Sequence, residues 1–210
     1  SKGIKTRFRG KLLKEQKRAA AEMLKFEDGV LVAPPGIGKT VIACSIIGKR
    51  KTPTLILVHR KALLDQWKSQ LIKFLTIDPR KIGILAGNSK RMGGVIDVAM
   101  IQSLTDKGKV NDLVGNYGQV IVDECHHISA TSFEQVIRQA KARFVIGLSA
   151  TVTRQDGQHP IIFMQCGPIR YRVDERQQAA ARSFTHTVIV RRTNFVLPRR
   201  MENAPEPSIQ

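Results

Sequence analysis

The sequence predicts an α/β fold, a three-layer α/β/α sandwich around a mainly parallel sheet. Short continuous apolar runs, typical of buried strands, alternate along the chain with helical patterns. Polar or glycine-rich segments follow four of these runs, which end at Ala33, Val58, Val122 and Leu148. Because ligands of parallel sheets bind beyond the carboxyl ends of the strands, we expect one functional edge.

The elements follow from apolar periodicity and from glycine and proline breaks. Gly29 opens the first strand, and Pro34, Pro35 and Gly36 end it. The strand-like runs are 30–33, 54–58, 81–85, 95–100, 120–122 and 144–148, and 186–196 resembles one more strand. The helical patterns are 14–26, 39–47, 61–75 and 132–142. The Pro-rich polar stretch 198–210 indicates a linker or tail.

The charge balance indicates a polyanionic partner. Lysine and arginine total 35 among 210 residues, against 17 aspartates and glutamates, which gives a net charge of +18. Nucleic acid is the commonest polyanion in the cytoplasm, so it is the expected partner. A solvated basic surface without a partner is the alternative. A long basic amphipathic helix with an aromatic face is missing from the sequence, which disfavours an anionic membrane.

The cysteines and the apolar runs indicate in which cellular compartment the protein is expected. Cys44, Cys125 and Cys166 lie far apart and form no C-x-x-C pair, which argues against a disulfide framework and against a zinc site. The sequence has no apolar run of roughly 18 to 20 residues, the length of a membrane span, and its first residues lack the apolar core of a secretory signal. We therefore expect a cytoplasmic protein of one domain.

The segment from Ala33 to Thr40 has the pattern of a phosphate-binding loop between a strand and a helix. Glycines let the backbone N–H groups approach phosphate oxygens, and the following helix start adds a partial positive charge. Lys39 can reach the β- and γ-phosphates, and Thr40 can offer its hydroxyl to Mg²⁺. The candidate ATP-binding residues in this loop are Pro35, Gly36, Ile37, Gly38, Lys39 and Thr40.

Two carboxylates follow the run that ends at Val122. Asp123 is placed to hold Mg²⁺, and Glu124 to orient and deprotonate an attacking water, so we expect Lys39, Asp123 and Glu124 to form the catalytic set. A cap for the next helix is the structural alternative. The segment 125–127, Cys-His-His, does not suit zinc, because three contiguous side chains diverge.

With the loop 36–40 and the tetrapeptide 123–126 (Asp-Glu-Cys-His), the chain resembles the DExH-box helicases of superfamily 2. The ordered match covers most of residues 12 to 157, and Arg154 with Asp156 is similar to an element of the XPB-like and type III restriction-subunit-like (ResIII) branch. The resemblance implies a P-loop NTPase fold of the RecA-like kind. It also implies ATP and Mg²⁺ as cofactors.

The resemblance implies further site residues. Gln16 lies where the family places an adenine-reading glutamine. The residues that link the nucleotide site to nucleic acid are His126, Ser149 and Thr151. The nucleic-acid-binding residues, which contact the backbone, are His59, Arg60, Gln102, Ser103 and Arg154.

The family resemblance divides the chain into a basic segment 1–28 with a Q-motif-like helix, a first RecA-like domain 29–197, and the linker or tail 198–210. We expect an ATP-dependent helicase or translocase motor domain that acts on nucleic acid, with DNA favoured over RNA. A second RecA-like domain, with an arginine finger, has no counterpart after residue 157, so the chain alone should not unwind. The alternatives are a restriction-enzyme-like translocase subunit, a non-catalytic nucleic-acid-binding module, or a different P-loop enzyme such as a small-molecule kinase.

Overall fold

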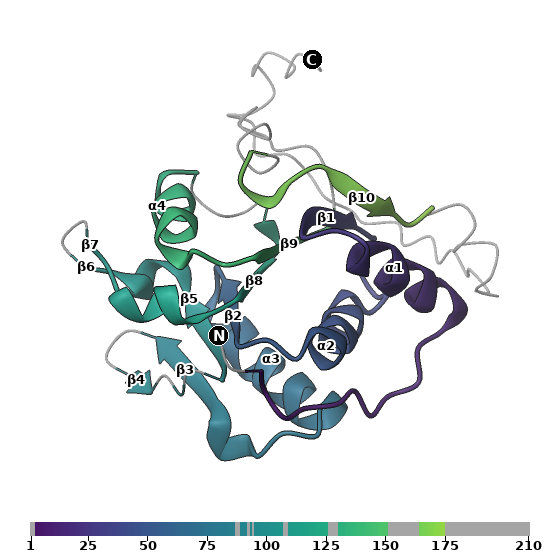
Figure 1. The fold of residues 1–210 in the computed structure, drawn as a ribbon, viewed down its shortest axis with the longest axis horizontal. Helices are drawn as coiled ribbons and strands as arrows, with labels where there is room; N and C mark the ends of the chain where they lie inside the picture. Colours follow the sequence, from purple (N-terminus) through teal and green to yellow (C-terminus); the bar gives the residue numbers. More distant parts are fainter. Residues whose placement is uncertain are drawn as a thin grey trace, which may run out of the picture.

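The sheet determines the arrangement of the molecule. The computed structural model describes residues 3–86, 89–91, 93, 95–106, 109–125, 130–150 and 164–174. Within these ranges eight strands form one sheet in the order β10-β1-β9-β8-β2-β5-β3-β4 (Figure 1). Neighbouring strands are parallel except for the antiparallel pair of β3 and β4. The strands are β1 (Asp28–Val32), β2 (Thr54–Val58), β3 (Ile82–Ala86), β4 (Ser89–Arg91), β5 (Ile96–Met100), β8 (Gln119–Asp123), β9 (Phe144–Ser149) and β10 (Ile169–Arg172).

Helices cover both faces of this sheet, as the sandwich requires. The α-helices are α1 (Lys14–Leu24), α2 (Lys39–Arg50), α3 (Lys61–Phe74) and α4 (Ala130–Ala140). Helices α1, α2 and α3 cover one face, and α4 lies on the other (Figure 1). Short 3₁₀ helices (Pro79–Lys81, Ile101–Leu104 and Asp112–Asn116) and a two-stranded sheet of β6 (Thr105–Asp106) and β7 (Lys109–Val110) complete the described elements. None of the helices in the described ranges is long and apolar enough to cross a membrane.

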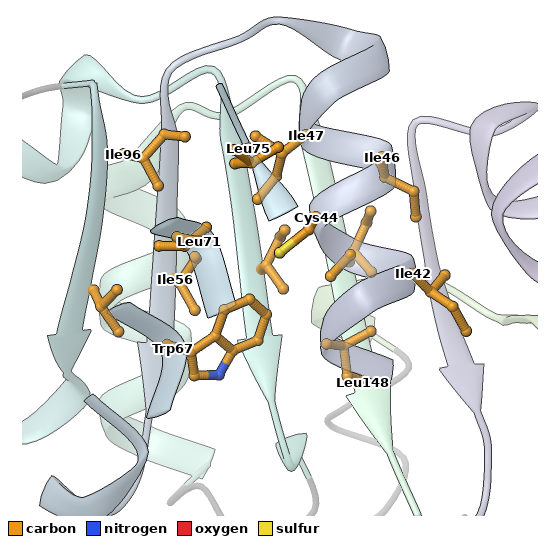
Figure 2. Packing of buried hydrophobic residues seen from close by; sticks show 14 of the residues in the cluster. Ile42, Cys44, Ile46, Ile47, Ile56, Trp67, Leu71, Leu75, Ile96 and Leu148 are labelled. Atoms are coloured by element: carbon orange, nitrogen blue, oxygen red, sulfur yellow. The ribbon is translucent and has the colours of Figure 1, made fainter. Parts of the chain in front are cut away.

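Successive strand residues contribute to two apolar clusters, one on each face of the sheet. In β1, Leu31 packs on the side of α2 and Val30 on the side of α4. In β2, Ile56 likewise packs on the side of α2 and Leu55 on the side of α4. Figure 2 shows the first cluster, where side chains from α2 and α3 fill the space over the strands. Burial on both faces explains why these strands read as continuous apolar runs rather than as alternating patterns.

The predicted three-layer fold is confirmed, and each strand and helix predicted within the described ranges is present. Helix α2 extends to Arg50, past the predicted end at Ile47. Gly48 does not end the helix but allows close packing, since a Cβ atom there would lie 2.6 Å from the backbone nitrogen of Phe8. The predicted strand 186–196 and the tail 198–210 lie outside the described residues.

Strand β10 was not predicted from the sequence. It pairs with β1 at the edge of the sheet and is only partly buried. Its sequence, IRYR, carries two arginines, because an edge strand exposes side chains that a central strand must bury. A search for continuous apolar runs therefore passes over it.

Candidate nucleotide site

The loop between β1 and α2 has the backbone that phosphate binding requires. Gly36 (φ 81°) and Gly38 (φ 88°) adopt left-handed conformations, which residues with a Cβ atom adopt only at a cost. Gly38 is the N-cap of α2, and a Cβ atom there would lie 2.7 Å from Gln16 Nε2. The N-terminal N–H groups of α2 have no intrahelical acceptor and can serve an anion.

Lys39 begins α2 and lies beside the acidic pair. Its Nζ donates to the carbonyl oxygen of Ala33 at 3.0 Å and lies 3.4 Å from Glu124 Oε1. The side chain is only 9% exposed. A buried ammonium needs such partners, because removal from water disfavours its charge. The structure thus brings Lys39 of the loop and Glu124 of the acidic pair to one point of the sheet edge.

Asp123 and Glu124 differ in their surroundings. Asp123 ends β8, and its Oδ2 accepts a hydrogen bond of 2.8 Å from the indole Nε1 of Trp67 in α3. Burial raises the pKa of the Asp123 carboxyl, and the indole hydrogen bond opposes this rise by favouring the charged form. Glu124 has a φ of 48°, a conformation that is strained in a residue with a Cβ atom.

Gln16 contacts the phosphate loop. Its Oε1 accepts from the backbone N–H of Leu13 at 2.9 Å, and its Nε2 donates to the carbonyl oxygen of Ile37 at 2.7 Å. The side chain therefore ties the start of α1 to the loop. Oε1 can accept one further hydrogen bond, and Nε2 can donate one more.

Strand β10 packs against the same loop, and no pattern in the sequence predicts this contact. Tyr171 packs against Ala33 and Ile37, and its hydroxyl donates to Glu15 Oε1 at 2.7 Å. Burial and the neighbouring Glu15 carboxylate raise the pKa of Tyr171 to about 12, so the hydroxyl keeps its proton. An aromatic residue in an edge strand gives no local signal of such a contact.

The proposed nucleic-acid segments follow neighbouring strands at the same edge. His59 and Arg60 follow β2, and Gln102 and Ser103 lie in the 3₁₀ helix after β5, which pairs with β2. Arg60 and Gln102 are exposed. Because β2 also pairs with β8, which carries Asp123, His59 and Arg60 follow the strand next to Asp123, and Gln102 and Ser103 follow the strand beyond it.

Ser149 lies between the loop and the acidic pair. It ends β9, which is flanked by β1 and β8. Its carbonyl oxygen accepts from the backbone N–H of Ala33 at 2.9 Å, and its side chain hydrogen-bonds to Cys125. The three other predicted residues, His126, Thr151 and Arg154, lie outside the described residues.

The cysteines lie in the interior. Cys44, Cys125 and Cys166 are buried, and burial raises the pKa of Cys44 and of Cys125 to about 12. These two thiols therefore stay protonated at neutral pH, which makes them poor nucleophiles and poor metal ligands. In the described part of the chain, no group of three or more His, Cys, Asp and Glu side chains could hold a metal ion.

The residues at the loop nevertheless fit Mg²⁺ in the presence of phosphates. Mg²⁺ prefers oxygen ligands and is usually held by one or two carboxylates together with substrate phosphates and water. The Asp123 carboxylate and the Thr40 hydroxyl are oxygen donors of this kind, and Thr40 lies in the first turn of α2. The donor set suits a metal that arrives with its nucleotide rather than a permanent metal centre.

The sequence of the chain matches a known protein family. Residues 9–154 match the family described as type III restriction enzyme, res subunit. The DNA 3'-5' translocase XPB2 of Sulfurisphaera tokodaii is 32% identical over 157 residues, which are 75% of this chain and 34% of that protein. The chain thus spans about a third of the length of this relative.

Solved structures share the fold. The UvsW helicase from bacteriophage T4 matches with a TM-score of 0.65 and 19% identity, over 81% of this chain and 64% of that chain. The SWI2/SNF2 ATPase core of Sulfolobus solfataricus, solved in complex with dsDNA, matches with a TM-score of 0.58 and 17% identity, over 80% and 38% of the two chains. At these identities the likeness concerns the fold.

Proposed function

We propose that this chain, which belongs to the family of type III restriction enzyme res subunits and is a first RecA-like domain of the superfamily 2 helicases, binds ATP with Mg²⁺ at the ends of β1 and β8. ATP hydrolysis there is coupled to movement on nucleic acid. One observation carries the proposal: Lys39 Nζ lies 3.4 Å from Glu124 Oε1, so the loop and the acidic pair share one site.

Each residue at the site has a role in phosphoryl transfer. The backbone N–H groups of the loop 35–38 receive the phosphates, and Lys39 neutralises their charge. Thr40 and Asp123 hold Mg²⁺, which neutralises charge that develops on the phosphate oxygens. Glu124 orients the attacking water and accepts its proton. Gln16 reads adenine with the hydrogen-bonding capacity left over from its contacts with Leu13 and Ile37.

The nucleic acid is proposed to cross the same sheet edge. His59, Arg60, Gln102, Ser103 and Arg154 are the proposed contacts, mainly to the backbone, so little base specificity is expected. The set His126, Ser149 and Thr151, part of a DExH box and a following Ser-Ala-Thr segment, links these contacts to the nucleotide. DNA is favoured over RNA because the relative XPB2 is named a DNA translocase. A cytoplasmic location accords with such a substrate.

A second RecA-like domain is proposed to complete the motor. It would supply an arginine finger, whose absence costs about 10³- to 10⁵-fold in rate. The 210-residue chain should therefore bind nucleotide but hydrolyse it slowly. Strand separation by this chain alone would contradict the proposal.

The deciding experiment is ATP turnover of the longer natural chain, with and without single- and double-stranded DNA and RNA. Stimulation by one of these polymers identifies the substrate. If none of the four nucleic acids changes the rate of ATP turnover, the protein is not a nucleic-acid motor. If the protein binds no nucleotide, it is a non-catalytic module.

A restriction-enzyme-like translocase subunit is the second candidate, favoured by the match of residues 9–154 to the res-subunit family. A translocase moves along duplex DNA without separating its strands. Displacement of a third strand from a DNA triplex, without separation of the duplex, would favour this candidate over a helicase.

A further inference from the structure

Trp67 makes a polar contact that the proposed roles do not use. It lies in α3 among the apolar side chains of the α2-side cluster, near Ile56 and Leu71 (Figure 2), and is 1% exposed. Its nitrogen, blue in Figure 2, faces the side on which the strand arrowheads lie. The indole has one N–H donor, and that donor goes to Asp123 Oδ2 at 2.8 Å.

We propose that Trp67 is a positioning residue that holds the Asp123 carboxylate in the orientation needed to receive Mg²⁺ with the nucleotide. The inference rests on the proposed function and deepens it. A residue that does not touch the metal can orient a metal-binding carboxylate by a hydrogen bond. Loss of such a hydrogen bond typically lowers metal affinity by about 10- to 100-fold. Trp67 and Asp123 are 56 residues apart in the chain and meet only in the folded protein.

A neutral indole suits this task better than a charged donor. A lysine or arginine would also reach a carboxylate, but its charge would neutralise Asp123 and weaken its attraction for a cation. The neutral indole N–H orients the carboxylate and leaves its negative charge in place. The ring is held by close packing, so the direction of the hydrogen bond is set by the core.

The position of Trp67 also relates the carboxylate to α3. This helix begins at Lys61, directly after His59 and Arg60, the proposed nucleic-acid contacts. Helix α3 is thus the element that carries both a proposed backbone-contacting segment at its start and the donor to Asp123 two turns later. Trp67 therefore positions Asp123 from the element that meets the polymer.

The chain contains a single tryptophan, so one indole N–H resonance in a ¹⁵N-labelled sample of the 210-residue chain reports on this contact. The resonance should move in the Asp123→Asn variant. In the wild type it should also move on addition of Mg²⁺ to the ADP-bound chain, and this second shift should be missing in Asp123→Asn. The proposal is overturned if the indole resonance moves neither in Asp123→Asn nor on addition of Mg²⁺ to the ADP-bound wild type.

Nucleotide binding gives the second readout, through titration of Mg²⁺ against a fluorescent ADP analogue. Trp67→Phe keeps an aromatic ring and removes the donor. We expect it to raise the Mg²⁺ concentration at half-saturation by about 10-fold or more, with nucleotide affinity in EDTA unchanged within about 2-fold. Leu71→Val, a core change in the same helix and cluster, is the matched control and should leave both values unchanged.

The outcomes separate the positioning role from the proposed function. Equal losses of affinity with and without Mg²⁺ in Trp67→Phe, or an unchanged Mg²⁺ dependence, would overturn the positioning role alone. A wild-type chain that binds no nucleotide would end the proposed function and the positioning role together. If Trp67→Phe does not fold, the indole resonance of the wild type and of Asp123→Asn still decides the question.

Discussion

Two polar clusters lie at opposite ends of the same helix and strand. Helix α2 runs from Lys39 to Arg50, and β8 runs from Gln119 to Asp123. We call Arg50, Gln119 and Thr54 the amino-end cluster, because it lies at the amino ends of strands β2 and β8, which begin at Thr54 and Gln119. The carboxyl-end cluster is Lys39, Asp123 and Glu124.

The amino-end cluster is closed by its own hydrogen bonds. Arg50 donates to Gln119 Oε1 at 3.1 Å and to the carbonyl oxygens of Met23 and Phe26 at 3.3 and 2.6 Å, and its guanidinium lies 4.1 Å from the ring centre of Phe144. Gln119 in turn donates to Thr54 Oγ1 at 3.2 Å. Burial lowers the pKa of Arg50 to about 10, and these contacts keep the buried cation satisfied.

The carboxyl-end cluster combines opposite charges with a strained backbone. The Lys39–Glu124 ion pair has a separation of 3.4 Å, and the neighbouring backbone is left-handed at Gly36, Gly38 and Glu124. Strain of this kind persists at functional sites because the surrounding fold imposes it. The same helix and strand thus form a closed hydrogen-bonded cluster at one end and gather charged side chains at the other, where we propose that the nucleotide binds.

Glu124→Gln should give the largest effect, because the amide cannot accept a proton from water. We expect ATP turnover, measured together with the proposed second RecA-like domain, to fall by about 10²- to 10⁴-fold. Nucleotide affinity and the thermal midpoint should stay near the wild-type values. A variant that loses nucleotide binding instead would show that Glu124 holds the nucleotide rather than the water.

Lys39→Ala should weaken nucleotide binding by about 100-fold or more, because it removes a charged donor to phosphate. Equilibrium titration with ADP and Mg²⁺ measures this loss. Arg80→Met removes an exposed cation that is paired with Asp78, and serves as the charge-matched control. Equal losses in both variants would mean that net charge, and not the loop, determines affinity.

Arg50→Met should affect stability and leave function intact. The methionine keeps an apolar stem but leaves carbonyl oxygens without their donor, so we expect the free energy of unfolding to fall by about 2–4 kcal/mol. Chemical denaturation measures the change, and nucleotide affinity should stay within about 2-fold. A large loss of affinity at unchanged stability would break the distinction between the two clusters.

Thr54→Val should give the smallest effect. The change keeps the shape of the side chain and removes a hydroxyl that accepts from Gln119 and donates to the carbonyl oxygen of Thr52. We expect a loss of about 1 kcal/mol in the free energy of unfolding, measured in the same way. If the free energy of unfolding does not change, the hydrogen bond between Arg50 and Gln119 stabilises the cluster without a contribution from Thr54.

The sequence predicts those parts of the candidate site that consist of residues adjacent in the chain. The phosphate loop and the acidic pair each follow a buried apolar strand, and parallel strands bring such segments to one edge. Gln16 was placed by resemblance, but its contact with Ile37 was not foreseen. Strand β10 was missed because an edge strand carries no continuous apolar run.

By itself, the sequence determined the alternation of the central strands with the helices and the three-layer sandwich, and it indicated the segments for which chemistry is proposed, because local periodicity and glycine placement encode them. The tertiary structure alone decided that Trp67 donates to Asp123 and that Tyr171 braces the loop. Such contacts depend on the directions of side chains from elements far apart in the chain. Packing of the folded core sets those directions, and no local pattern records them.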